Sequence, residues 1–134
     1  MQIAIRNKMN RKKGQAMVET ALVLPFIILI LLGIIDFGIL FNNYLIVSNA
    51  SRECARNVVV GMTDTSLQTL YYDVTRPLDF NKLRMDVNVP PSERKKGVEV
   101  TVTITYQYDF LTPIIGAFTH GPVTLTGRTV MRIE

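Results

Sequence analysis

Residues 20–35 read TALVLPFIILILLGII, a run of sixteen uncharged residues between Glu19 and Asp36. The stretch FGILF at 37–41 continues the apolar character beyond the lone Asp36. A helix rises about 1.5 Å per residue, so sixteen residues span about 24 Å, and the extended run exceeds the roughly 20 residues that a bilayer crossing needs. Pro25 would kink a helix in water but is tolerated in a membrane. The sequence therefore predicts one transmembrane helix near the N-terminus.

Positive charge is concentrated in front of this apolar run. The 134 residues include 15 Lys and Arg against 11 Asp and Glu, a formal net charge of +4. The first thirteen positions contain no acidic residue and five basic ones: Arg6, Lys8, Arg11, Lys12 and Lys13. Basic residues in front of a span keep that end in the cytoplasm, so the C-terminal bulk is expected outside. From Gln15 onward ten basic and eleven acidic residues remain, which argues against nucleic-acid binding.

The composition disfavours several classes of protein. Hydrophobic residues make up 48% of the chain and charged residues 19%, which is the opposite of a disordered protein. One cysteine and one histidine give no internal disulfide framework and no metal quartet. No Ser/His/Asp set, no Cys/His pair at useful spacing and no phosphate-binding loop is recognisable. We therefore expect no enzymatic activity, no metal and no cofactor.

The apolar run has two ordinary explanations, a single-pass anchor or a cleaved secretory signal. A secretory signal has a basic leader, a short apolar core and a small-residue cleavage site. Here the apolar core is long, and the nearest small-residue site is Ser48-Asn49-Ala50, after Phe41. This composition favours the anchor and leaves the secretory signal as the alternative.

Beyond the membrane run the helical pattern continues but changes character. Apolar and small residues recur three and four positions apart, at Leu40, Tyr44, Val47, Ser51, Cys54 and Val58, with Ala50 and Ala55 beside them. The other side is polar, with Asn42, Asn49, Arg52, Glu53, Arg56 and Asn57. No turn signal occurs before Gly61, a residue suited to end a helix. The spacing predicts one helix from about Gln15 to Val60, whose second half has an apolar stripe that another element must cover.

The remainder of the chain is expected to supply that cover. Residues 63–66 offer N-caps for a short helix that ends before Pro77 and has its apolar face at Leu67, Leu70, Tyr71 and Val74. Apolar and polar residues then alternate over 83–89, 98–108 and 123–133, the pattern of three antiparallel strands with one buried face. Residues 111–122, with Pro113, Gly116 and Gly121, are expected to form a loop. The predicted fold class is α+β: a long N-terminal helix packed on a small antiparallel sheet, with one short extra helix.

Several single residues have ordinary structural interpretations. Cys54 is expected to be a buried structural thiol, with an intermolecular disulfide in the oxidising periplasm as the alternative. The basic run 94–96 is expected to be a solvated hairpin tip, or alternatively a docking patch. His120 is expected to be exposed. The core is expected to contain Tyr71, Tyr106 and Tyr108.

The stretch GQAMVE at 14–19, between the basic leader and the apolar helix, resembles the class III signal of prepilins. In that signal a dedicated peptidase cuts after the glycine on the cytoplasmic side, and the glutamate is the fifth residue of the mature chain. More narrowly, three stretches resemble TadE-type pilin-like proteins of the tight-adherence (Flp pilus) system: GQAMVETALVLPFIILILLGIIDFG at 14–38, NASRECAR at 49–56 and LTGRTVMRIE at 125–134. Thr20, where the signal usually has an apolar residue, and Asp36, where Glu is commoner, depart from the pattern.

The resemblance implies how the chain is processed and divided. Cleavage between Gly14 and Gln15 would remove the basic leader, residues 1–14. It would leave 15–41 as the transmembrane part of the helix and 42–134 as a periplasmic or extracellular α+β pilin-like domain.

The resemblance also implies a role for the first carboxylate of the span. Glu19 would pair with the new α-amino group of a neighbouring subunit or of its own chain, which would offset the cost of a carboxylate near the apolar phase. The alternative is a carboxylate that stays hydrated at the membrane surface. Asp36 is assigned to the outer interface, where a charge costs little, or alternatively to contact with a partner subunit.

The function implied is that of a pilin-like subunit, a minor pilin or pseudopilin, in assembly of a tight-adherence (type IVc) pilus for surface adhesion. The implied partners are the prepilin peptidase, other pilin-like subunits of the TadF and TadG type, and the assembly platform of the bacterial inner membrane. TadG-like chains are usually longer, which favours TadE. Two other functions stay open: an unprocessed single-pass protein whose outer domain binds a ligand or partner, and a soluble binding domain freed by signal peptidase.

Overall fold

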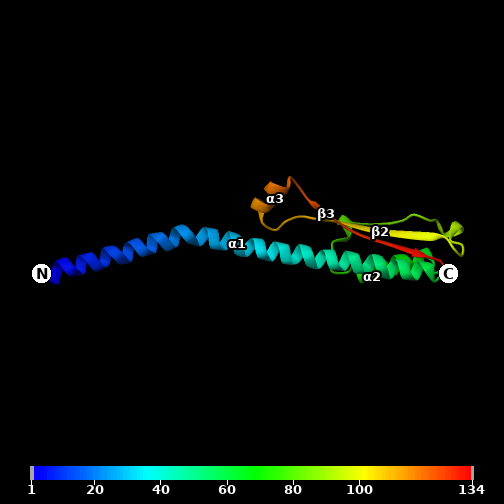
Figure 1. Ribbon diagram of the computed structural model, residues 1–134, viewed down its shortest axis with the longest axis horizontal. Helices are drawn as coiled ribbons and strands as arrows, with labels where there is room; N and C mark the ends of the chain where they lie inside the picture. Colours follow the sequence, from blue (N-terminus) through cyan, green and yellow to red (C-terminus); the bar gives the residue numbers. More distant parts are fainter. Residues whose placement is uncertain (1, 134) are drawn as a thin grey trace. The chain divides into compact units, whose positions relative to one another are not determined.

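The computed structural model describes residues 2–133, and within this range the side chains of residues 2–13, 114 and 118 lie outside the description. The chain contains three helices, three strands and two single turns of 3-10 helix among the described residues (Figure 1). In chain order they are α1 (Gln2–Val59), α2 (Asp64–Val74), η1 (Phe80–Lys82), β1 (Leu83–Val87), η2 (Pro91–Glu93), β2 (Glu99–Tyr108), α3 (Pro113–Thr119) and β3 (Val123–Arg132). Two compact units follow one another, the first ending at Asp36 and the second beginning at Phe37.

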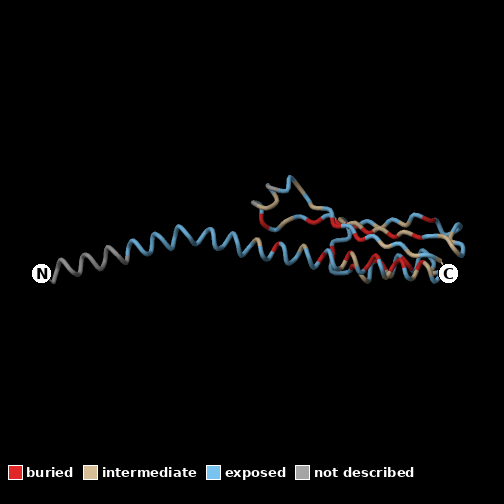
Figure 2. Tube along the Cα trace, viewed as in Figure 1, coloured by how far each residue is buried: buried red, intermediate tan, exposed pale blue. Residues whose placement is uncertain are grey.

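The apolar part of α1 belongs to the first unit, and most of its described side chains are exposed. The exposed fractions of Phe26, Ile30 and Ile34 are 65%, 60% and 64%, and Figure 2 shows the exposed class over almost the whole run. Among the described residues, α1 is one helix long and apolar enough to cross a membrane. A core helix of a water-soluble protein would bury such residues instead. The segment is thus compatible with membrane anchoring.

Helix α1 begins earlier than expected and ends as expected. It already starts at Gln2, whereas we placed its start near Gln15. The preceding residues contain no proline, and one glycine at position 14 costs only about 1 kcal/mol relative to alanine in a helix. At the other end Gly61 has a φ of 91°, and the Met62 amide donates to the carbonyl of Asn57 at 3.0 Å. This left-handed glycine ends α1 in the usual way for a helix C-terminus.

The second unit contains an antiparallel sheet with the order β1-β2-β3. Strand β1 pairs with β2 from Leu83 opposite Tyr106 to Val87 opposite Val102. Strand β3 pairs with β2 over ten residues, from Arg132 opposite Glu99 to Val123 opposite Tyr108. Figure 1 shows the strands along one side of the C-terminal half of α1. The predicted α+β class and the three antiparallel strands are confirmed.

The core lies between the stripe of α1 and the inward face of the sheet (Figure 2). Val47 and Cys54 on the helix have exposed fractions of 0%, as do Val100, Val102 and Ile104 on β2. The predicted stripe is confirmed from Val47 to Val58.

Leu40, the first predicted residue of the stripe, packs against the core, and the stripe is wrong at the second, Tyr44. Tyr44 is 43% exposed, whereas Asn43 is buried. Positions 43 and 44 lie four and three residues before Val47, so both satisfy helical spacing, and the pattern alone could not choose between them.

Helix α1 and strand β3 approach closely at Gly127. A Cβ atom at this position would lie 2.5 Å from the carbonyl oxygen of Val47 and 3.0 Å from Cα of Ser48. The next inward residue of β3, Thr129, shares a hydrogen bond of 2.9 Å with Ser51 on the helix. Only a residue without a side chain fits at 127, so glycine sets the separation between helix and sheet.

Helix α2 covers another part of the core, as predicted. Its N-cap is Thr63, whose hydroxyl oxygen accepts from the Ser66 amide at 3.4 Å. Leu67 and Tyr71 are buried on its inward face. Burial raises the pKa of Tyr71 from 10.0 to about 12, with smaller contributions from Tyr72 and Cys54. The phenol of Tyr71 is therefore held neutral by the core.

Residues 111–122 contain a helix where we expected only a loop. Helix α3 begins at Pro113 and ends at Thr119, and His120 follows in the left-handed conformation with a φ of 57°. Proline at the first helical position lacks only an N–H that has no intrahelical acceptor there. The prediction was wrong because Pro113 and Gly116 are also typical turn residues, and a helix of seven residues is too short to show periodicity.

We predict that Gly127→Ala lowers the free energy of unfolding of the second unit by about 1–3 kcal/mol, the range for overpacking a filled site. The new methyl group would meet the backbone of α1, which cannot move aside as a side chain does. Chemical denaturation of the full chain in detergent micelles, followed by circular dichroism, measures this. Gly116→Ala is the matched control, because nothing lies within 4 Å of a Cβ there. Equal stabilities of the two variants would contradict the close approach.

We predict a second effect at alkaline pH. The raised pKa of Tyr71 contributes stability that is complete below pH 10 and is lost as the pH rises to about 12. Across that window the wild type should lose up to about 2 kcal/mol relative to Tyr71→Phe, because one pKa unit corresponds to about 1.4 kcal/mol. Denaturation at a series of pH values measures the difference. Tyr72→Phe is the control, because Tyr72 is 46% exposed, and it should lose as much stability as the wild type between pH 10 and 12. If Tyr71→Phe also lost as much stability as the wild type, Tyr71 would not be a desolvated phenol.

Candidate processing and assembly segment

The predicted cleavage site lies on an exposed part of α1. Gly14 and Gln15 are exposed, and a Cβ atom at Gly14 would meet nothing within 4 Å. The basic side chains of the leader, at positions 6, 8, 11, 12 and 13, lie outside the described side chains. The peptide bond between Gly14 and Gln15 is within a helix, so a peptidase would need to unwind this turn locally.

Glu19 is one helical turn beyond Gln15, and its side chain is exposed. Residues four apart on a helix are neighbours on one face. A positive amine created at residue 15 would therefore arise close to the Glu19 carboxylate of the same chain. The same exposure leaves Glu19 available to an amine of another subunit.

Thr20 departs from the prepilin pattern without leaving an unsatisfied group. Its hydroxyl donates to the carbonyl of Ala16 at 2.9 Å. A threonine that bonds to its own helix backbone presents mainly its methyl group to the surroundings. The departure is thus compatible with an apolar environment.

Asp36 closes the apolar run, and it is fully buried. A carboxylate that is removed from water must be hydrogen-bonded or neutralised, since an isolated buried charge is costly. This burial sets Asp36 apart from the exposed Glu19. The burial of Asp36 does not decide between its two predicted roles, a charge at the outer interface and a contact with a partner subunit. Both stay predictions.

The spacing of the two carboxylates limits where Glu19 can lie in a membrane. Asp36 is seventeen positions after Glu19 on the helix, a rise of about 25 Å, and the hydrocarbon layer is about 30 Å thick. With Asp36 at the outer boundary, Glu19 lies within the inner edge of the apolar layer, and any tilt of the helix brings it deeper. The carboxylate then needs a neutralising partner or a path to water.

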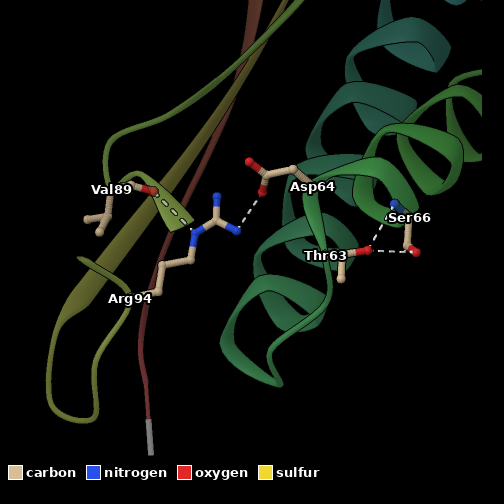
Figure 3. A network of polar contacts seen from close by, with 5 residues as sticks. All are labelled: Thr63, Asp64, Ser66, Val89 and Arg94. Atoms are coloured by element: carbon tan, nitrogen blue, oxygen red, sulfur yellow. Dashed lines mark hydrogen bonds and ion pairs between the residues drawn. The ribbon is translucent and has the colours of Figure 1, made fainter. Parts of the chain in front are cut away.

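The basic run 94–96 is a solvated tip only in part. The side chain of Arg94 is 10% exposed, and its Nη1 lies 2.6 Å from Oδ1 of Asp64 at the start of α2 (Figure 3). Its Nε donates to the carbonyl of Val89 at 3.2 Å. Arg94 therefore holds the β1–β2 connection against α2, and the predicted solvated position is wrong for it. Lys95 and Lys96 are exposed as expected.

The remaining predicted positions agree with the structure. Cys54 is a free, buried cysteine, as the structural interpretation requires. His120 is exposed. The core contains Tyr71, Tyr106 and Tyr108.

The secretory interpretation conflicts with the packing of α1. Its nearest cleavage site ends at Ala50, whose exposed fraction is 1%. Cleavage there would cut α1 inside the core and remove Val47, which is 0% exposed and contacts the sheet at Gly127. The second unit therefore needs the helix from at least Val47 onward.

Sequence reasoning missed two structural positions, Gly127 and Arg94. Glycine in the middle of a strand is a known sign of close backbone approach, so position 127 offered a signal. Arg94 lies in a run of three basic residues, and nothing in that run distinguishes the member that forms the ion pair.

The fold and this segment define a class of α+β proteins: one long apolar N-terminal helix, compatible with membrane anchoring, continues into a small domain packed on its C-terminal half. Within that class, residues 14–56 match the family model of TadE-like proteins, which confirms the resemblance for this part of the chain. The match begins at Gly14 and does not extend to the C-terminal stretch at 125–134. Comparison with curated proteins and with solved structures gave no match. A TadE-like segment implies involvement in the tight-adherence pilus system.

Proposed function

We propose that the protein is a pilin-like subunit, a minor pilin or pseudopilin, that takes part in assembly of a tight-adherence (Flp-type) pilus and is not an enzyme. The observation that carries the proposal is the position of Gly14 and Glu19. The TadE-like match starts at Gly14, directly before an apolar helix whose side chains are exposed. The second unit is held by the same helix, so lateral packing of helices would bring outer domains together as well.

The proposed sequence of events follows from the charges. A prepilin peptidase removes the basic leader, residues 1–14, and creates an amine at Gln15. Glu19, near the inner edge of the apolar layer, pairs with this amine or with that of a neighbouring subunit. A carboxylate near the bilayer centre costs about 2.5–3.5 kcal/mol on insertion scales, and less near the edge. Pairing removes part of that cost and sets the register between subunits.

The proposed location is the bacterial inner membrane, with the N-terminus in the cytoplasm and the second unit outside. Proposed partners are the peptidase, other pilin-like subunits of the TadF and TadG type, and the inner-membrane assembly platform. The basic leader supports this orientation. The alternative is an unprocessed single-pass protein whose outer domain binds a ligand or partner. Cleavage after Gly14 distinguishes the two functions, because only the pilin-like subunit is cleaved there.

We predict that the protein isolated from membranes lacks residues 1–14, and that Gly14→Leu keeps the full length. A peptidase must accommodate the side chain at the cut, and glycine has none. Intact mass spectrometry measures the N-terminus directly. Gly38→Leu is the matched control, since a Cβ at Gly38 also meets nothing within 4 Å, and it should be cleaved normally. Full-length wild type would favour the single-pass alternative, and loss of about fifty residues would restore the secretory one.

We predict that Glu19→Ala inserts into the membrane and is cleaved, but does not support piliation. Removing the carboxylate makes the segment more apolar, so membrane retention should be equal or better. Glu19→Gln should fail in the same way, because it keeps size and hydrogen bonding without the charge. Thr20→Val, which removes only a hydroxyl bonded to its own backbone, should assemble normally.

The measurement is surface pili per cell in a strain where mature protein of each variant is confirmed by mass. This condition is necessary because the peptidase can also recognise Glu19. Wild-type piliation by cleaved Glu19→Ala would refute the pairing, although the membrane topology would stand.

A further inference from the structure

The second unit has an apolar end that is exposed in part. It is formed by the segment 110–119, which reads FLTPIIGAFT and contains α3. Leu111 is 70% exposed, and Ala117 is also exposed. From Phe110 to Gly127 there is no Asp, Glu, Lys or Arg.

A ring contact places this segment at the start of the second unit. The rings of Phe37 and Phe110 lie 6.5 Å apart in an edge-to-face arrangement, and Phe110 also contacts Tyr108 at 5.4 Å. Phe37 follows the last residue of the uncharged run, Ile35, by only two positions. Phe37 itself therefore follows the end of that run by a rise of about 3 Å, and the segment 110–119 is connected to this position through the contact of Phe110 with Phe37.

Exposed apolar residues continue along α1 at this level. Phe37 and Phe41 are each 61% exposed, and Tyr44 and Leu45 are 43% and 44% exposed. Beyond them the exposed residues of α1 become polar, with Asn49 and Arg52. Aromatic side chains are typical of the membrane–water interface, where one end is apolar and the other hydrated.

Charge is distributed in agreement with this arrangement. The exposed lysines at 95 and 96 precede the first residue of β2, Glu99, whereas α3 follows its last residue, Tyr108, so the lysines and α3 belong to opposite ends of this strand. The charged residue that directly precedes the apolar segment in the sequence, Asp109, is bonded to Lys82 at 2.7 Å. This bond raises the pKa of Lys82, so the pair stays intact at neutral pH. Neutralisation lowers the cost of bringing this edge of the domain close to lipid headgroups.

We infer that residues 110–119 lie in the outer interface of the same membrane that α1 crosses, as a second and monotopic membrane contact. The occupant of the apolar surface is lipid, because the surface continues the apolar exposure of α1 and is free of charge. This inference rests on the membrane anchoring in the proposed function. One helix leaves an outer domain free to tilt, and a second contact fixes the face that the domain presents to other subunits.

The test uses tryptophan, which the chain lacks. Leu111→Trp in the full chain, reconstituted at one copy per lipid nanodisc, provides a single fluorophore at the proposed contact. One copy per disc removes self-association as an explanation. We expect blue-shifted emission, several-fold weaker quenching by aqueous iodide than at Lys96→Trp, and stronger quenching by lipids brominated near the headgroup than by lipids brominated near the chain ends.

Two controls separate this inference from the anchoring on which it rests. Leu29→Trp, within the uncharged run, should be quenched by lipids brominated deep in the acyl chains. Val130→Trp, at an exposed position on β3, should be quenched by aqueous iodide as strongly as Lys96→Trp. This control tests whether an exposed apolar position is by itself enough to protect the tryptophan from iodide. If Leu29→Trp is deep while Leu111→Trp is as accessible to iodide as Lys96→Trp, the interfacial contact is refuted and the anchor stands. If Leu29→Trp is also accessible, both are refuted.

Discussion

The packing of a small-residue stripe of α1 against β3 is the interaction on which the second unit depends. At Gly127 the strand meets the carbonyl of Val47 with no side chain between them, and Ser51 is bonded to Thr129 one position further along. This close approach lets Cys54 and Ala55 reach 0% exposure beneath the sheet. The helix that carries the apolar N-terminal run is therefore also the central core element of the second unit.

The spacing of apolar residues was sufficient to predict the secondary structure wherever one face of a long helix or strand is buried. The stripe from Val47 to Val58 and the alternation in β2 predicted both partners of the core, because spacings of 3.6 and 2.0 are distinct over ten or more residues. The prediction failed at Tyr44 and in α3. Two neighbouring positions satisfied the helical spacing in the first case, and seven residues with Pro113 and Gly116 resembled a turn in the second. Arg94 could not be predicted because its partner, Asp64, is 30 residues away.

The candidate site differs from the fold in how far sequence can define it. Gly14 and Glu19 belong to a short motif with fixed spacing, so their positions are readable without a structure, and the family match begins at the first of them. Under the proposed function, the partner of Glu19 is a property of the assembled state, because the amine belongs to a processed chain. Asp36 is the reverse case: its sequence position suggested an interfacial charge, and only the structure reveals its full burial.

Under the proposed function, the energetics of leaving the membrane depend on both apolar contacts. Moving the α1 run from lipid into a bundle of like helices changes its surroundings little, because apolar neighbours replace apolar lipid. Glu19 makes the separate subunit in lipid less stable by up to a few kcal/mol, and pairing in the bundle removes that penalty. The segment 110–119 acts in the opposite direction, because Leu111 would exchange lipid for water unless another subunit covers it. A domain held by both contacts is therefore released most readily where a neighbouring subunit supplies an amine to Glu19 and an apolar surface to Leu111 together, which couples extraction to assembly.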